Sequence, residues 1–121
     1  MNCPSETARG LLRDWRERGL FLLALLEAAE GRLLLKGVAL VNDLSENDVL
    51  TLTLEQSELT LILRDVTYTS LESSEGPADF AAVVTGTILQ IRFPGFRLSL
   101  AVLRKQPVIH WGEKANSPAT H

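Results

Sequence analysis

The chain has 121 residues, of which 45% are hydrophobic and 22% charged, and a formal net charge of −3. This length allows one domain with its own hydrophobic core but not two ordinary domains, and the composition is typical of a globular protein. No apolar run approaches the roughly 18 residues that a transmembrane helix requires, so we expect no membrane partner. Residues 32–83 are predominantly acidic and residues 84–121 predominantly basic, an asymmetry that permits head-to-tail self-association or a local anion site.

The N-terminal segment predicts one helix that packs on a sheet. Ser5 can cap its start and Gly19 is a natural stop. Apolar residues at helical spacing form one stripe between these two positions: Ala8, Leu11, Leu12 and Trp15. Acidic residues interrupt the basic segment before Leu20, so we expect no signal peptide. The single cysteine, Cys3, cannot form an internal disulfide, which favours a reducing compartment and a cytoplasmic protein.

The next two segments predict a pair of antiparallel strands. Residues 20–30 fit either a helix, which leucine and alanine favour, or a buried strand that ends at a Glu30-Gly31 turn. We favour the strand, which would pair with residues 33–41 through the turn. Residues 33–41 are apolar on both faces, and Gly37 marks a bend or a close backbone approach.

The central segment predicts a hairpin with leucines on one face. With Gln56-Ser57 at the tip, the opposed pairs are Leu54/Leu59, Leu52/Leu61 and Leu50/Leu63. A four-residue loop over 55–58 keeps the same register and is equally compatible with the pattern. Beyond residue 63 the apolar positions change phase, which predicts a bulge near Arg64-Asp65 within one strand.

Polar breaks at 43–48 and 73–79 precede the last predicted hairpin, and a polar tail follows it from Gln106. This hairpin has Pro94-Gly95 at its tip. One face carries Phe93/Phe96, Ile91/Leu98, Leu89/Leu100 and Thr87/Val102, and the other carries Arg92/Arg97 and Gln90/Ser99. Two opposed arginines require an anionic partner or full solvation, since like charges directly opposite each other are destabilising.

These elements predict a mainly β (α+β) protein. An N-terminal helix precedes five or six antiparallel strands that form a strongly bent sheet or a small SH3-like or Sm-like barrel. Residues 1–105 would form a single helix-capped domain, and residues 106–121 a loosely ordered tail in which only 108–111 docks on the body.

Two short patterns resemble the signatures of Sm-like proteins. Gly37, Asp43 and Asn47 have the spacing Gly-x5-Asp-x3-Asn, and residues 61–65 read Leu-Ile-Leu-Arg-Asp where the family has three apolar residues, Arg and Gly. The resemblance covers roughly residues 5–71. It implies a ring-forming small barrel that binds RNA bases and phosphates through the positions that match Asp43, Asn47 and Arg64. Without it, Asp43 and Asn47 would shape a turn and Arg64 would pair with a surface carboxylate.

Two further binding modes fit the sequence. At the tip of the last hairpin, the arginines adjoin aromatic residues and could stack on a base and contact phosphate: Arg92, Phe93, Phe96 and Arg97. The alternative is that both phenylalanines close the core and both arginines are solvated. The small residues Ala39, Gly86 and Ala101 could leave room for a small ligand inside a barrel.

Catalytic chemistry has little support in this sequence. The only histidines, His110 and His121, lie in the tail, and neither their positions nor that of Cys3 resemble a catalytic unit or a zinc site. No glycine-rich phosphate loop is present. We therefore expect no catalytic residues, no metal and no cofactor. The leading hypothesis is a non-catalytic β module for self-association or protein interaction, with RNA binding and small-ligand binding as alternatives.

Overall fold

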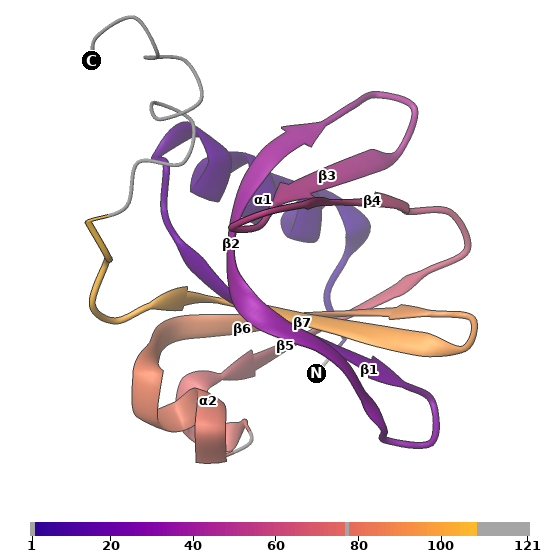
Figure 1. Ribbon diagram of the computed structural model, residues 1–121. Coiled ribbons are helices and arrows are strands. Elements are labelled where there is room, and N and C mark those ends of the chain that lie inside the picture. Colours follow the sequence, from indigo (N-terminus) through magenta and orange to yellow (C-terminus); the bar gives the residue numbers. More distant parts are fainter. Residues whose placement is uncertain (1, 77, 109–121) are drawn as a thin grey trace, which may run out of the picture.

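The computed structural model describes residues 2–76 and 78–108 (Figure 1). The elements in chain order are helix α1 (Ser5–Glu17), strands β1 (Leu22–Ala28), β2 (Leu33–Leu44), β3 (Val49–Thr53), β4 (Glu58–Ile62) and β5 (Thr67–Glu72), the 3-10 turn η1 (Ser73–Glu75), helix α2 (Ala78–Val83), and strands β6 (Val84–Phe93) and β7 (Phe96–Leu103). All of these strands form one antiparallel sheet of seven strands in the order β4-β3-β2-β1-β7-β6-β5. Within these described residues, neither helix is long and apolar enough to cross a membrane.

The mainly β fold with an N-terminal helix is confirmed, whereas the strand number and the barrel closure are not. The predicted bulge near Arg64-Asp65 is wrong. Asp65 has a φ of 56°, a left-handed conformation that turns the chain, so that β4 and β5 are separate strands instead of one bulged strand. They lie at opposite ends of the sheet order, which gives seven strands and leaves the sheet open rather than closed into a barrel.

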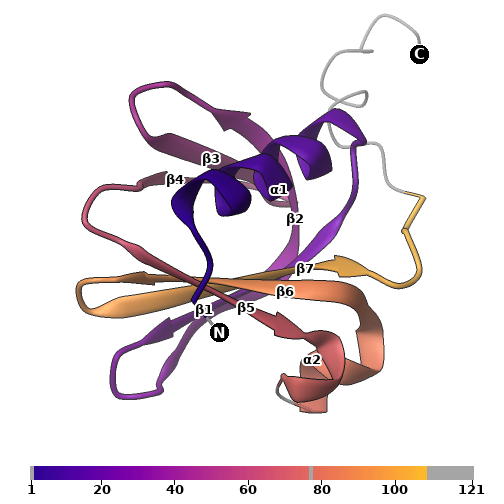
Figure 2. The same ribbon diagram turned by 180° about the vertical axis from the view of Figure 1, so that it is seen from behind.

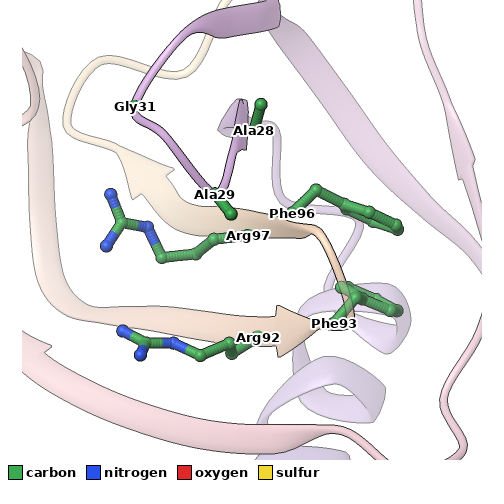
Figure 3. A pocket seen from close by; sticks show the side chains of 7 residues that line it. All are labelled: Ala28, Ala29, Gly31, Arg92, Phe93, Phe96 and Arg97. Carbon is green, nitrogen blue, oxygen red and sulfur yellow. The ribbon is translucent and has the colours of Figure 1, made fainter.

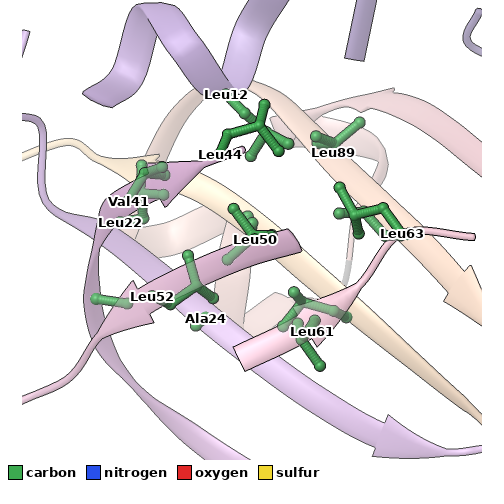
Figure 4. Packing of buried hydrophobic residues seen from close by; sticks show 14 of the residues in the cluster. Leu12, Leu22, Ala24, Val41, Leu44, Leu50, Leu52, Leu61, Leu63 and Leu89 are labelled. Atoms are coloured by element: carbon green, nitrogen blue, oxygen red, sulfur yellow. The ribbon is translucent and has the colours of Figure 1, made fainter. Parts of the chain in front are cut away.

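Helix α1 covers the inner face of the sheet, the face that carries Ala24 and Leu100, and packs mainly on β2 (Figure 2). The predicted stripe is correct, because Ala8, Leu12 and Trp15 are buried against this face. Figure 4 shows Leu12 of α1 pointing toward leucines from several strands. The Ser5 cap is wrong: Ser5 is the first helical residue, Pro4 occupies the N-cap position, and no side chain caps the helix.

Strands β1 and β2 settle the ambiguous apolar run as a strand. β1 pairs with β2 on one side and with β7 on the other, so Ala24 lies between Gly37 and Leu100. β2 pairs first with β1 and then, from Leu40 onward, with β3. Its apolar residues on both faces therefore pack in two halves of a bent sheet. Gly37 lies three residues before Leu40, where the partner strand changes.

The β3-β4 hairpin differs from the predicted register by two residues. Leu52 pairs with Leu59 and Leu50 with Leu61, and the turn is closed by the Leu54 N–H, which donates to the Ser57 carbonyl at 2.8 Å. A shift by two keeps leucine opposite leucine, because side chains alternate with a period of two. It also moves Glu58 away from Glu55 and places it opposite Thr53, which removes a like-charge pair.

The β6-β7 hairpin follows the predicted register near its tip. Its observed pairs include Phe93/Phe96, Arg92/Arg97, Ile91/Leu98, Gln90/Ser99 and Leu89/Leu100. The predicted pair Thr87/Val102 is wrong, because the register shifts between Thr85 and Leu89 and Val102 pairs with Thr85. Gly86, with a φ of 76°, supplies the backbone conformation of this bulge.

Helix α2, which the sequence did not indicate, covers part of the outer face of the sheet. Phe80 of α2 packs with residues of β1, β6 and β7 in a second apolar cluster: Leu23, Val84, Ile88 and Ala101. Just beyond the C-terminal end of β7, the Gln106 side chain receives a hydrogen bond from the Phe21 N–H at 2.7 Å and donates to the Phe21 carbonyl at 3.0 Å. Of the predicted docking patch 108–111, only Val108 lies within the described residues, and it is 88% exposed.

Candidate functional site

Strand β4 forms an edge of the sheet at which no other described segment pairs. The opposite edge, β5, is partly covered by the N-terminal segment. Asn2 forms an antiparallel bridge with Thr69, and the Cys3 N–H donates to the Tyr68 carbonyl at 3.0 Å. The two edges are therefore not equivalent, and β4 is the more open one.

The backbone groups that β4 presents outward follow from its pairing with β3. The Leu54–Ser57 bond and the bond from the Leu63 N–H to the Asp48 carbonyl, 2.7 Å long, mark hydrogen-bonded positions at both ends of the hairpin. In an antiparallel pair, hydrogen-bonded and non-hydrogen-bonded positions alternate. Leu59 and Leu61 therefore bond to β3, and the N–H and C=O groups of Glu58, Thr60 and Ile62 point away from it.

The same three residues turn their side chains to the outer face, where all are exposed. Ile62 is 55% exposed, which is unusual for a large apolar side chain, while Leu61 beside it is buried in the core. The Glu58 carboxylate accepts a hydrogen bond from Asn42 Nδ2 at 3.2 Å. Arg64 lies two residues beyond the strand, is exposed, and makes no ion pair with any described residue. The edge thus combines free backbone groups, one apolar side chain and both signs of charge.

The three positions suggested by the Sm-like resemblance lie on two neighbouring turns and one strand. The Leu63–Asp48 hydrogen bond holds the 45–48 turn next to the 63–65 turn, which brings Asn47 and Arg64 to the same end of the β3-β4 hairpin. Both side chains are exposed. Asp43 lies in β2 and forms an ion pair with Arg16 of α1 at 3.7 Å, so it helps to attach the helix to the sheet.

The four residues predicted at the β6-β7 tip also come together, but on two faces. The Phe93 and Phe96 rings stack with centroids 4.5 Å apart and planes 11° apart, and Phe93 is buried in the main core. Figure 3 shows both guanidinium groups extending away from the two rings. Phe93 is therefore not available to stack on a base beside the arginines.

The arginines lie in a small pocket between the β6-β7 tip and the β1-β2 turn. The pocket has a volume of about 190 Å³ and is lined by Ala28, Ala29, Gly31, Arg92, Phe93, Phe96 and Arg97 (Figure 3). Arg97 Nη2 donates to Glu27 Oε1 at 2.8 Å. Arg97 Nε is buried and has no hydrogen-bond partner among the described residues, and Arg92 forms neither a hydrogen bond nor an ion pair with them. A buried polar group without a partner costs about 1–3 kcal/mol.

Sequence reasoning identified the arginine pair but not its surroundings. The tip of a hairpin is local in sequence, so the opposition of Arg92 and Arg97 could be read from the pattern. Glu27 and the 28–31 turn come from another hairpin, some 70 residues away along the chain. Nothing in their composition marks them, because only the pairing of β1 with β7 brings them to the pocket.

The pKa of the buried Tyr68 hydroxyl lies above its ordinary value. Burial raises the pKa of Tyr68, while Arg9 and a hydrogen bond with the Ser5 side chain act in the opposite direction. Within the described part of the chain, no three His, Cys, Asp or Glu side chains come together in a way that could hold a metal ion. His110 and His121 lie outside the described residues.

The small residues that suggested an internal ligand space do not border one common space. Ala39 is buried in the main core, Ala101 is buried in the cluster under α2 on the opposite face, and Gly86 is exposed at the bulge. The two alanines accompany close packing, whereas no described residue packs on Gly86.

Comparisons with protein-family models, with curated proteins and with solved structures found no match to this chain.

Proposed function

We propose that this chain is a non-catalytic association module of the cytoplasm that pairs with a second copy of itself along β4. The observation that carries the proposal is the open edge, where Glu58, Thr60 and Ile62 present their backbone groups and an exposed apolar side chain. Such an edge binds another strand through main-chain hydrogen bonds.

The inequality of the two edges supports a two-fold dimer. Head-to-tail assembly would require β4 of one copy to pair with β5 of the next, and the N-terminal bridge to Thr69 occupies part of that edge. Pairing of β4 with β4 needs no rearrangement and is closed by a two-fold axis, the commonest symmetry of homo-oligomers.

An antiparallel pairing centred on Thr60 is also compatible with the charges. It places Glu58 of one copy opposite Ile62 of the other, so no like charges face each other directly. Arg64 then lies diagonally across from Glu58 of the second copy, within reach of a long side chain. The contact is short, so we expect weak, concentration-dependent dimerisation rather than a permanent complex.

Hydrogen exchange of individual amides tests this pairing directly. The N–H groups of Glu58, Thr60 and Ile62 should exchange rapidly in dilute protein and become protected as the concentration rises. The N–H groups of Leu59 and Leu61 bond to β3 and should be protected throughout, so they serve as internal controls. If the outward amides exchange equally fast at all concentrations, β4 is not the contact.

The variant Thr60→Pro removes an outward donor without removing a bond to β3, because proline is tolerated at such positions of an edge strand. In the symmetric dimer it deletes two backbone hydrogen bonds, which should weaken association about tenfold or more. Thr60→Val retains the N–H and is the matched control. A further variant, Ile62→Lys, should also weaken association. Unchanged dimerisation in both T60P and I62K would contradict the proposal.

A second candidate function, RNA binding, is favoured by the juxtaposition of Asn47 and Arg64 on neighbouring turns. The Sm-like resemblance assigns these positions to RNA contact. The test is binding of a short single-stranded RNA at low and raised salt by the original chain and by a variant with both Asn47→Ala and Arg64→Ala. Binding that weakens with salt and is lost in this variant would support it.

A further inference from the structure

One row of residues on the outer face carries an uncompensated positive charge. Glu27 of β1, Arg97 of β7, Arg92 of β6 and Thr67 of β5 are direct neighbours across four adjacent strands. The single carboxylate pairs with Arg97, so Arg92 stands beside another cation without a counter-charge among the described residues. This arrangement is unfavourable unless an anion or water compensates it.

Arg92 and Arg97 line the same pocket, which is where such an anion would lie. Glu27 engages Nη2 of Arg97, and Nε of the same guanidinium is buried without a described partner and is closed to a ligand. The donors of Arg92 have no described partner and remain for an anion. The pocket volume of about 190 Å³ is well over ten times the roughly 10–15 Å³ that one water molecule requires, so an oxyanion fits.

We infer that the pocket between the β1-β2 turn and the β6-β7 tip binds a small ligand through a phosphate or carboxylate group held by Arg92 and Arg97. A guanidinium offers planar, charge-assisted donors that match both kinds of oxyanion. Ala28, Ala29 and the partly exposed Phe96 form the apolar part of the pocket beside this group. The site is distinct from the proposed contact, because none of the residues that line it belongs to β4.

Titration calorimetry with inorganic phosphate and, in a separate arm, with acetate tests the site at constant ionic strength and distinguishes the two chemistries. Arg92 is exposed and unpaired, so Arg92→Gln should leave folding intact and weaken binding about tenfold or more, the effect expected for a charge-assisted contact. Arg13→Gln is the matched control, since Arg13 is exposed on α1, far from the pocket, and should bind as the original chain does.

A second readout follows the Arg97 Nε–H resonance by nuclear magnetic resonance. Addition of the bound anion should shift this resonance, because the anion binds the same guanidinium, while the Arg13 resonance stays unchanged. Absence of saturable binding in both arms, equal weakening by R92Q and R13Q, or an Arg97 Nε–H resonance that does not respond would each overturn the inference.

Discussion

Single residues with positive φ decide where the strands of this protein end. Asp48 and Asp65 are the only described non-glycine residues in the left-handed region, and each sits at a turn beside the β3-β4 hairpin. Aspartate tolerates this conformation better than most residues because its short side chain can bond locally. Glycine adopts this conformation with even less strain, because it has no Cβ.

Substitutions at Asp65 should therefore follow backbone preference rather than charge. Asp65→Val should lower the free energy of unfolding by about 1–2 kcal/mol, because a β-branched residue is strained at this φ. Asp65→Gly should not lower it, and Asp65→Asn is the control that changes the charge but keeps the local tolerance. Urea unfolding of the three variants measures this. A D65V variant as stable as D65N would contradict the account.

Tyr68 should make the protein sensitive to alkaline pH. Since its pKa is higher in the folded than in the unfolded chain, the folded state retains the proton to higher pH. The resulting stability is fully present below the unfolded value of about 10 and is lost as the pH rises through the folded value. Urea unfolding at about pH 8 and about pH 11 should therefore show a larger loss in the original chain than in Tyr68→Phe. Equal losses in the two chains would contradict this, because groups other than Tyr68 would then cause the loss of stability at alkaline pH.

At the scale of elements, the attachment of α1 rests on a few leucines in the main core. Leu12 is fully buried, whereas Leu33 in β2 is 54% exposed. Leu12→Ala should lower the free energy of unfolding by about 2–5 kcal/mol, since it leaves a cavity under the helix. Leu33→Ala deletes the same atoms at the surface and should change it by about 0.5 kcal/mol or less. Similar losses in the two variants would mean that α1 does not pack as described.

The hairpins show which registers the sequence could determine. The β6-β7 register could be predicted because Pro94-Gly95 marks the turn and the apolar face fixes the pairing on both sides. The predicted β3-β4 register differs from the observed one by two residues, because leucine recurs at every second position from 50 to 54 and from 59 to 63. Such a pattern excludes a shift by one residue but not by two. The hydrogen bond from the Leu54 N–H to the Ser57 carbonyl, which closes the turn, distinguishes the observed register from the predicted one.

At the scale of the whole molecule, the order of strands was the feature that local patterns could not supply. Alternation indicates which face of a strand is buried, but not which strands become neighbours. The insertion of β6 and β7 between β1 and β5 depends on contacts between distant segments, and so does the pocket around Arg97. The open edge at β4 is a consequence of this order, and so is its difference from β5.

An open edge strand is also a hazard, because it can pair with unrelated chains. Glu58 and Thr60 place polar groups beside the free backbone, and only Ile62 adds apolar surface. The edge is therefore suited to one short, selective contact rather than to indiscriminate pairing.

The measurement that tests this account most directly is the absolute molar mass in solution, by light scattering coupled to size exclusion, over about a tenfold range of concentration. We expect the mass to rise with concentration from that of one chain toward that of two, and the T60P variant to remain at one chain under the same conditions. A mass of one chain at every concentration would contradict self-association through β4. A larger closed ring would contradict the two-fold pairing and favour the Sm-like alternative.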